Sequence, residues 1–334
     1  MDARNLRYAD LFAGIGGMGM PLARLGARCV YASEIDRSAR ETHARNHHAD
    51  VLDGRDIRDV LPSEIPDHDI LLAGFPCQPF SSVRRKHPEG FADKDKGTLF
   101  HEIIRILQAR RPKAYLLENV PRLVTLDHGD TLRTIVAGLR YIGYSVHWRI
   151  VCSSNFLPQK RERVYFAGYS DMSSFHFHRM RIPHARPPIE GILHDGSHVE
   201  AAYTDARGYA SESYTLSDSQ LAYLRRRMAV LKQRKGRRGG FVRLRPLSGH
   251  EQGHTLIRQY MGNFGSDILI AQEDKLPRRL TPRECSRYMG YDTGRESQFA
   301  LPESDNAAYR QLGNGVAVPV VAEILRTVLG QWPT

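Results

Sequence analysis

Short apolar segments alternate with helical patterns through the first 170 residues of this 334-residue chain. Residues 99–107 repeat their apolar side chains at the spacing of a helix. The alternation predicts an α/β fold, with a mainly parallel sheet covered by helices on both faces. Such sheets bind ligands beyond the carboxyl ends of their strands. The expected strands are Leu6–Phe12, Arg28–Ser33, Ile70–Gly74, Ala114–Glu118, Ser145–Cys152 and Arg163–Tyr169.

The pattern changes after residue 170, where His, Pro and Gly are scattered through residues 173–211. A capping box at Ser217–Gln220 then predicts a helix with an apolar stripe over Leu221–Leu231. A second capping box, Thr281–Glu284, and an apolar helix over Val318–Leu329 restore the regular pattern. We expect an α/β domain over 1–170, an irregular lobe over 171–280, and a return segment over 281–334 that completes the first domain.

The chain carries a strong positive charge. Its 48 Lys and Arg residues outnumber 37 Asp and Glu, for a formal net charge of +11 and a pI near 9.6. Residues 171–260 hold 15 basic and 8 acidic residues, and Arg225–Arg245 holds 10 basic residues, three glycines and no acid. Because solvated helix faces usually mix both signs, this run is more typical of a loop that approaches phosphates. We therefore expect a nucleic acid partner.

The four cysteines, Cys29, Cys77, Cys152 and Cys285, lie far apart and form no CxxC pair. This spacing argues against a zinc site or a disulfide framework, so no metal is expected. The N-terminus lacks the apolar core of a signal peptide, and no apolar run reaches the roughly 20 residues of a membrane span. We expect a cytoplasmic protein with free thiols.

Three polar sites follow successive expected strands. Asp10–Gly19 leads through a glycine-rich turn into a helix and contains GxGxxG, which lets a ligand approach the backbone. Glu34 follows the next strand, where a carboxylate can accept hydrogen bonds from ribose hydroxyls, and Asp56 follows a third segment. Each feature alone also fits a tight turn or a surface acid, but their succession predicts a nucleotide-like ligand.

The segment Gly74–Ser81 is the most informative part of the sequence. Cys77 lies just beyond the strand Ile70–Gly74 and between two prolines, which restrict its backbone. A lone cysteine is more often a small buried hydrophobe, but this setting favours a reactive thiol. We expect the polar residues 82–97 that follow to form a loop that closes over a substrate.

Two further segments carry ionisable groups. Glu118 ends an apolar strand, so we expect a partly desolvated acid with a raised pKa. Gln159–Arg163 precedes the last strand of this region, and on an extended strand Gln159, Arg161 and Arg163 would point to one face. A plain surface edge is the alternative interpretation of that alternation.

Taken in order, these segments resemble the motifs of bacterial cytosine-5 DNA methyltransferases of the restriction-modification type, over nearly the whole chain outside the basic lobe. Asp10–Gly19 resembles the first cofactor motif of that family, Gly74–Ser81 its Pro-Cys motif and Glu118–Val120 its catalytic acid motif. Gln159–Arg163, Arg279–Glu284 and Gly313–Pro319 resemble its QxRxR, RxLTPRE-like and final motifs, although Arg279–Thr281 lacks the one-residue spacer of some members. The resemblance implies a Rossmann-like, S-adenosylmethionine-dependent methyltransferase sheet.

The resemblance also implies a chemistry. Cys77, preceded by Pro76 of the same catalytic motif, would add as a thiolate to carbon 6 of cytosine, which makes carbon 5 nucleophilic toward the methyl group of S-adenosylmethionine. Glu118 would hydrogen-bond or protonate ring nitrogen 3, and Arg163 and Arg161 would hold the carboxylate and the base. Because neighbouring bases block this attack in a stacked duplex, the cytosine must flip out, at a cost of roughly a few kcal/mol.

The same resemblance assigns binding residues. Glu34 would bind the ribose, Asp56 and Ile57 the adenine, and Phe12 would pack on the adenine side. The cofactor set is Phe12, Gly14, Gly16, Glu34, Ile35, Asp56, Ile57, Leu99, Asn314 and Val316, and the product would be S-adenosylhomocysteine.

The expected partner is double-stranded DNA. Thr255-Leu256 matches the Thr-Leu pair of the variable lobe of the family, and residues 214–270 resemble members that read CC-containing sites such as CCWGG or CCGG. Arg pairs with guanine and Gln with adenine, with phosphate contacts as the alternative role. We expect a monomer with a companion restriction endonuclease. The expected DNA contacts are Ser81, Gln159, Arg243, Arg245, Thr255, Arg258 and Gln259.

Three other functions are weighed against this one. An NAD-dependent dehydrogenase would explain the glycine-rich turn and Glu34, but neither Cys77 nor the basic lobe. A tRNA cytosine-5 methyltransferase of the same family has a Cys-Phe-Thr tripeptide and a reduced recognition lobe, whereas this sequence has no such tripeptide and a long lobe. A non-catalytic DNA-binding relative would normally have lost part of the Pro-Cys or Glu-Asn-Val set, and both are present.

Overall fold

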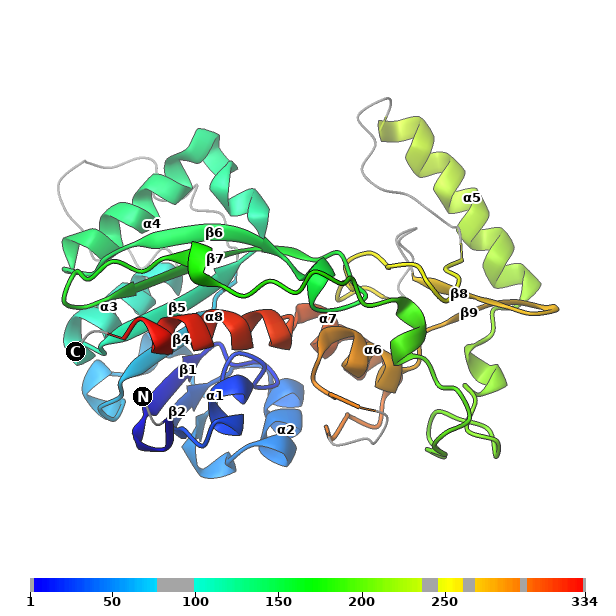
Figure 1. Ribbon diagram of the computed structural model, residues 1–334, viewed down its shortest axis with the longest axis horizontal. Helices are drawn as coiled ribbons and strands as arrows, with labels where there is room; N and C mark the ends of the chain where they lie inside the picture. The colour runs from blue at the N-terminus through cyan, green and yellow to red at the C-terminus, as the bar shows by residue number, and fades with distance from the viewer. Residues whose placement is uncertain (1–2, 77–98, 236–245, 261–267, 295–298, 333–334) are drawn as a thin grey trace. The chain divides into compact units, whose positions relative to one another are not determined.

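The computed structural model describes residues 3–76, 99–235, 246–260, 268–294 and 299–332, with only the backbone for 227–235. The chain forms two compact units, whose elements are labelled in Figure 1. The first unit comprises Met1–Cys152, Glu162–Arg181 and Val320–Thr334, and the second comprises Ser153–Arg161 and Ile182–Pro319. The expected return segment 281–334 is therefore shared: its larger part belongs to the second unit and its end to the first.

A seven-stranded sheet forms the centre of the first unit, in the order β3-β2-β1-β4-β5-β7-β6. Strands β1 to β5 pair in parallel, whereas β7 runs antiparallel to both β5 and β6. The sheet confirms the predicted α/β fold and adds an antiparallel edge and a short strand, β3. The strands are β1 (Arg7–Leu11), β2 (Arg28–Ser33), β3 (Leu52–Asp53), β4 (Ile70–Gly74), β5 (Ala114–Asn119), β6 (His147–Cys152) and β7 (Glu162–Tyr169).

Helices pack on the sheet through apolar side chains. Leu107 of α3 and Leu139 of α4 are fully buried in one core cluster with Leu117 of β5. Near the C-terminus, the Tyr169 hydroxyl donates to the carbonyl of Val328 in α8 at 2.8 Å. The helices of this unit are α1 (Met20–Arg24), α2 (Arg37–Asn46), α3 (Leu99–Arg110), α4 (Asp130–Tyr141) and most of α8 (Val318–Gly330).

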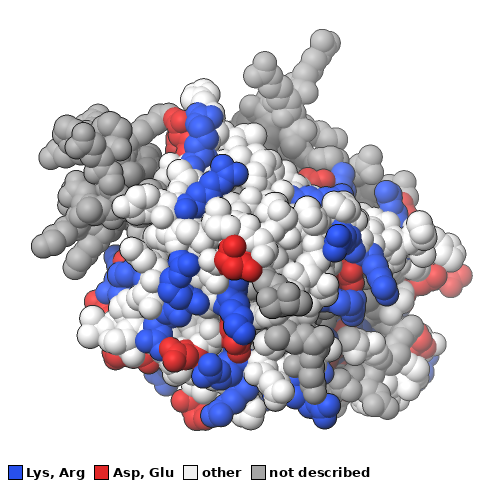
Figure 2. Space-filling model, turned by 60° about the vertical axis from the view of Figure 1, so that its left-hand side comes forward, with Lys and Arg blue, Asp and Glu red and all other residues white. Residues whose placement is uncertain are grey.

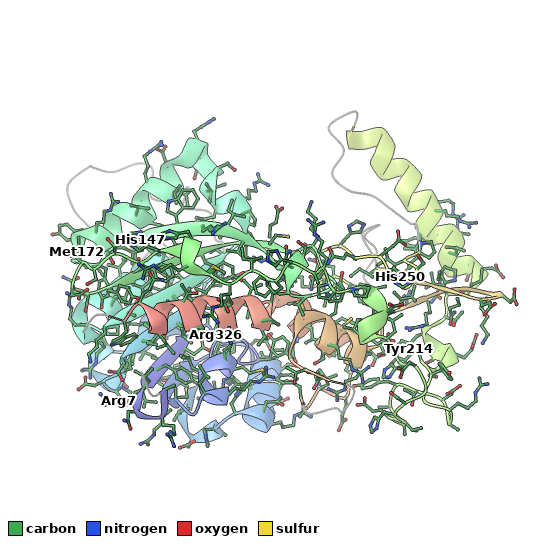
Figure 3. All side chains as sticks on the ribbon, viewed as in Figure 1. Arg7, His147, Met172, Tyr214, His250 and Arg326 are labelled. Carbon is green, nitrogen blue, oxygen red and sulfur yellow. The ribbon has the colours of Figure 1, made fainter. Side chains whose placement is uncertain are left out.

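The second unit combines an apolar cluster around Leu216 and Leu269 with buried polar side chains. Arg278 and Glu284 form an ion pair with Nη1 and Oε2 2.7 Å apart and side chains only 7% and 0% exposed. The Tyr214 hydroxyl, labelled in Figure 3, donates to Asp305 Oδ2 at 3.0 Å. The elements of this unit are α5 (Asp218–Lys235), β8 (Leu269–Gln272), β9 (Lys275–Arg279), α6 (Pro282–Met289) and α7 (Asp305–Asn314).

Both predicted capping boxes are present. The Gln220 N–H donates to Ser217 Oγ at 3.2 Å, and the Ser217 N–H donates to Gln220 Oε1 at 2.9 Å, so α5 begins where the sequence indicates. The Glu284 N–H and Thr281 Oγ1 form the equivalent bond of α6. Capping of this kind satisfies N–H groups that have no partner within the helix.

Residues 305–330 are long and apolar enough, by composition, to be tested as a membrane span. They form two helices, α7 and α8, and 67% of the most apolar window is buried inside the protein. Burial of this extent indicates a core segment. Within the described ranges, Cys29, Cys152 and Cys285 are free thiols.

Candidate active site

The glycine-rich turn between β1 and α1 depends on unusual backbone angles. Phe12, Gly14 and Gly16 have φ angles of 56°, 56° and 87°. Residues with a side chain rarely adopt positive φ angles, because the Cβ atom then clashes with the backbone. Glycine at positions 14 and 16 avoids this strain, whereas Phe12 is strained. A Cβ at Gly14 would meet no atom within 4 Å. The backbone of the turn therefore borders open space that a ligand can occupy.

Glu34 connects this turn to the end of β2. Its Oε2 accepts a hydrogen bond from the Gly14 N–H at 2.9 Å, and its Oε1 accepts one from the Asp36 N–H at 2.8 Å. The Arg40 guanidinium donates to the backbone carbonyls of Glu34 and Ile35 at 2.9 and 2.8 Å. The carboxylate is thus fixed beside the turn at the carboxyl edge of the sheet, where the sequence predicts it.

The remaining cofactor candidates of the first unit differ in exposure. Ile35 is 64% exposed, which is high for a large apolar side chain. Asp56 caps the short 3-10 helix Ile57–Asp59, and hydrogen bonds from Arg58, helped by its charge, lower the pKa of Asp56 to about 2. The Ile57 side chain belongs to the apolar core, and Phe12 and Leu99 are partly buried against that core.

The carboxyl ends of β4 and β5 bring the expected catalytic acid next to the Pro-Cys segment. Gly74 on β4 is paired in register with Glu118 on β5. The Asn119 side-chain amide donates to the carbonyl of Phe75 at 3.0 Å, which fixes the backbone two residues before Cys77. Pro76 is exposed and is the last residue described before the gap. Cys77 and the expected loop 82–97 lie outside the described residues.

Glu118 forms an ion pair with Arg163. The Arg163 Nε and Glu118 Oε1 atoms are 3.0 Å apart, and the two side chains are 14% and 12% exposed. Arg163 comes from β7, which pairs antiparallel with β5. A charge-assisted bond at low exposure holds the carboxyl group in one orientation. The structure thus brings together two side chains to which the resemblance assigns catalysis.

Arg161 makes several contacts with backbone carbonyls that the sequence did not predict. Arg161 lies one residue before the start of β7 at Glu162, and it belongs to the second unit. Its guanidinium, 2% exposed, donates to the backbone carbonyls of Leu256, Gly313 and Gly315. These irregular segments need polar partners for their carbonyls, and Arg161 supplies them. Arg161 thus bonds three backbone carbonyls of the second unit, and its expected contact with the catalytic carboxylate stays a prediction.

Gln159 is likewise turned inward. It is fully buried, its Nε2 donates to the Tyr288 carbonyl at 3.0 Å, and its Oε1 accepts from the Leu256 N–H at 2.9 Å. A side chain with both ends bonded inside the protein has no surface to offer to DNA. Its expected DNA contact is therefore replaced by a bond to the segment that carries the Thr-Leu pair.

The other expected DNA residues that are described lie next to that pair. Thr255 Oγ1 donates to the Lys160 carbonyl at 2.8 Å, and Arg258 and Gln259 are exposed. A Cβ at Gly313 would lie 2.3 Å from the carbonyl carbon of Ile257, so only glycine permits this approach of α7. Asn314 is exposed and Val316 buried, whereas Ser81, Arg243 and Arg245 lie outside the described residues.

Sequence reasoning missed side chains that support the site from within. Asp10 is 2% exposed, and its Oδ2 accepts a hydrogen bond from the Gly19 N–H at 3.0 Å. Burial raises the pKa of Asp10 to about 8, against the effect of that bond. An acid within an otherwise apolar strand needs a polar partner. The position of Asp10 in such a strand was therefore the signal that could have identified it. Asn119 lies in the motif Glu118–Val120, but the sequence assigned it no role.

The distribution of charge can be followed on one face of the described surface. Figure 2 shows one face, on which Lys and Arg side chains are dispersed among Asp and Glu. The densest basic run, Arg225–Arg245, has described side chains only for its first two residues. The net charge of the whole chain and the motif resemblance therefore remain the main support for a nucleic acid partner.

The sheet order, the glycine-rich turn on β1 and the acid–arginine pair beside the Pro-Cys segment define an α/β methyltransferase fold. The model of the C-5 cytosine-specific DNA methylase family matches residues 6–330, and the chain belongs to this family. It is a DNA cytosine methyltransferase, as the order of the motifs predicted. This result excludes the dehydrogenase alternative.

Two curated relatives agree over nearly the whole chain. Type II methyltransferase M.NlaX of Neisseria lactamica is 41% identical over 321 residues, which cover 95% of this chain and 94% of the relative. Type II methyltransferase M.DsaV of Dactylococcopsis salina is 38% identical over 330 residues, which cover 98% and 87%. The Dnmt2 methyltransferase of S. pombe, a solved structure, shares the fold with a TM-score of 0.72 at 21% identity, covering 98% of this chain and 99% of that one.

Proposed function

We propose that the enzyme moves the methyl group of S-adenosylmethionine to carbon 5 of a cytosine flipped out of double-stranded DNA, through a covalent bond to Cys77. The Glu118–Arg163 pair carries this proposal, because Glu118 lies on β5, the strand next to β4, whose end leads to Cys77. Acid, arginine and thiol-bearing segment thus share the carboxyl edge of a parallel sheet, where such folds bind ligands.

Cys77 acts as the nucleophile. Its thiolate bonds to carbon 6 of the cytosine, and the ring electrons shift toward carbon 5, which takes the methyl group as the methyl–sulfur bond of the cofactor breaks. A base then removes the proton from carbon 5, the carbon–sulfur bond at carbon 6 breaks, and the Cys77 thiolate is restored. Pro76 and the Asn119–Phe75 hydrogen bond restrict the backbone that presents the thiol.

Glu118 and Arg163 act on the polar edge of the base. Glu118 supplies a hydrogen bond or a proton to ring nitrogen 3, which draws electrons into the ring as the thiolate adds. Arg163, with its Nε 3.0 Å from Glu118 Oε1, fixes the direction of that carboxyl group. The pair therefore aligns the acid before the base arrives, which lowers the cost of ordering it during the reaction.

The first unit fits S-adenosylmethionine, which supplies the methyl group when bound. Gly14 borders open space, and the Glu34 carboxylate beside it is placed to accept hydrogen bonds from ribose hydroxyls. Ile35 exposes 64% of its surface next to Glu34, which suits the flat face of an adenine. Asp56, capping the 3-10 helix that follows β3, is the proposed partner of the adenine amino group.

We assign sequence reading to the second unit. Arg258 and Gln259 are exposed and chemically suited to guanine and adenine edges. Arg161 and Gln159 are positioning residues, since their bonds to Leu256 fix the segment that carries Thr255. A CC-containing target such as CCWGG or CCGG is proposed from the resemblance of residues 214–270.

The relatives named type II methyltransferases support a restriction-modification setting. We infer a monomer in the bacterial cytoplasm, with a companion endonuclease that cuts the unmethylated target. Sedimentation of the free enzyme and of its DNA complex measures the stoichiometry, and one chain per target is the expected result.

Covalent trapping tests the mechanism. An oligonucleotide with 5-fluorocytosine at the target position is expected to hold the enzyme in a complex that resists denaturant, because fluorine replaces the proton that must leave carbon 5. Bisulfite sequencing of DNA from expressing cells first identifies the target. A cognate fluorinated duplex that gives no complex contradicts the covalent step.

Two variants separate the roles within the site. Cys77→Ala is expected to abolish both methyl transfer and trapping while DNA binding survives. Glu118→Gln, which keeps the shape but lacks the ionisable group, is expected to slow methyl transfer by about 100-fold or more at unchanged DNA affinity. Trapping of a fluorinated tRNA in preference to DNA would instead support the tRNA alternative.

A further inference from the structure

The imidazole ring of His47 packs against the glycine-rich turn at Gly16. A Cβ placed on Gly16 would lie 2.1 Å from Nε2 and 2.4 Å from Cδ2 of that ring. The ring therefore occupies the space that any larger residue at position 16 would need. Gly16 also has a φ of 87°, so two independent requirements select glycine here.

The same ring forms a hydrogen bond with the turn. Burial lowers the pKa of His47, and a hydrogen bond with the backbone of Ile15 opposes that shift, as expected when an imidazole N–H donates to a carbonyl. Nε2 is buried without a hydrogen-bond partner, so the donor is Nδ1. His47 is thereby assigned the neutral tautomer with its proton on Nδ1.

Helix α2 connects this contact to Glu34. His47 follows the last residue of α2, and its N–H donates to the His43 carbonyl at 2.8 Å. At the other end, the Asp36 N–H donates to the Glu34 carboxylate, and Arg40 binds the Glu34 carbonyl. One helix thus contacts Glu34 at its start and the glycine-rich turn just after its end.

A cavity of about 610 Å³ lies on this flank of the first unit. It is lined by parts of β1, α1 and α2, including Asp10, His43 and His47. The cavity is partly open to solvent, and Gly16 and His47 both lie on its wall. The His47 ring crosses that region and makes a direct contact.

We propose that His47 is a positioning residue for cofactor binding. Its ring holds Ile15 and Gly16 in the shape that the cofactor meets, while α2 adds a second link between the turn and Glu34 beside the direct Gly14–Glu34 hydrogen bond. This inference rests on the proposed function, because it takes the turn and Glu34 to be the cofactor site. His47 contacts the turn at Ile15 and Gly16 and acts only through the backbone.

Three substitutions separate the hydrogen bond from the packing. His47→Asn places an amide N–H near the position of Nδ1 but removes most of the ring. His47→Phe keeps a ring beneath Gly16 but has no donor. His48→Asn is the matched control, because His48 is the exposed neighbour.

The readout is the dissociation constant of S-adenosylhomocysteine for the full chain, measured by titration calorimetry, together with the melting temperature. We expect about tenfold weaker binding for His47→Phe, corresponding to one hydrogen bond, and about threefold for His47→Asn. His48→Asn is expected to equal the wild type. The KM for S-adenosylmethionine rises in parallel, while kcat at saturation changes less than twofold.

A role in stability alone predicts another pattern: a lower melting temperature with unchanged affinity per folded molecule. That result for His47→Phe overturns the proposal. A wild-type chain that binds no S-adenosylhomocysteine contradicts the proposed function instead, so the two failures are distinct.

Nitrogen-15 NMR of the histidine rings uses the wild-type protein, so this test does not depend on whether a variant folds. Resonances of His47 are expected to show the Nδ1–H tautomer and to shift when S-adenosylhomocysteine is added. An Nε2–H tautomer, or a ring that does not respond to the ligand, overturns the proposal.

Discussion

The two units of this enzyme are stabilised by different means. The first has a continuous apolar core in which Leu107, Leu117 and Leu139 are fully buried around a sheet. The second has an apolar cluster around Leu216 and adds buried ion pairs: Glu284 is paired with Arg278, and Arg283 with Asp292 at 2.6 Å, all at low exposure. Apolar burial has no preferred direction, whereas buried ions need specific partners. We therefore expect size-conserving substitutions of buried residues to lower the free energy of unfolding more in the second unit than in the first.

The largest effect is expected for Glu284→Gln. The substitution preserves shape but leaves Arg278 buried without its counter-charge, and removal of one partner of a buried ion pair costs about 3–5 kcal/mol. Urea unfolding followed by circular dichroism measures the loss. A change below about 1 kcal/mol would show that Arg278 finds another partner and would remove the contrast between the units.

This contrast also explains how far the sequence could be interpreted. The apolar runs predicted β2 and β4 with the bounds that the structure shows, because buried parallel strands are continuous apolar segments. Helix α2 was missed because it is polar and buries only Ala39, Thr42 and His43. In the second unit, partners such as Arg278 and Glu284 leave no periodic pattern.

The site shows the same division. Glu34 and the glycine-rich turn were predicted as neighbours because both follow adjacent strands. The contacts of Arg161 and His47 could not be predicted, since each depends on the path of a distant segment: residues 256–315 in one case and α2 in the other. Motifs locate the reacting groups, but the side chains that hold them require the folded structure.

The next effect is a pH dependence in the first unit. Burial raises the pKa of Asp10 to about 8, whereas an unfolded aspartate titrates near 4. The folded chain keeps this proton where the unfolded chain has lost it, so the contribution of Asp10 to stability is present below about pH 4 and falls as the pH rises to about 8.

Asp10→Asn removes this titration and keeps an acceptor for the Gly19 N–H. The difference in unfolding free energy between variant and wild type should move in favour of the variant by up to about 1.4 kcal/mol per pH unit between pH 5 and 7. Urea unfolding at pH 5, 6, 7 and 8 provides the comparison. A constant difference would mean that Asp10 is ionised in the folded chain.

A smaller effect is expected for Leu107→Met, the size-conserving change in the apolar core. Volume-conserving substitutions usually cost less than about 1.5 kcal/mol, because the new side chain can refill the space. Leu107→Ala, which leaves a cavity, is the control and should cost about 2–5 kcal/mol. If Leu107→Met lowers the free energy of unfolding as much as Glu284→Gln, the need of buried ions for specific partners does not distinguish the two units.

The smallest effect is expected for Glu41→Gln, which tests whether burial or the charge itself determines the loss. Glu41→Gln makes the same chemical change as Glu284→Gln, but in a pair on α2 whose Arg37 and Glu41 side chains are 86% and 59% exposed. Water and salt already screen that pair, and exposed helix pairs of this spacing contribute about 0.3–0.5 kcal/mol. Urea unfolding at low and high salt should therefore show a change near the limit of measurement, and none at high salt. A loss comparable to that of Glu284→Gln would mean that the response follows the chemistry of the pair and not its burial.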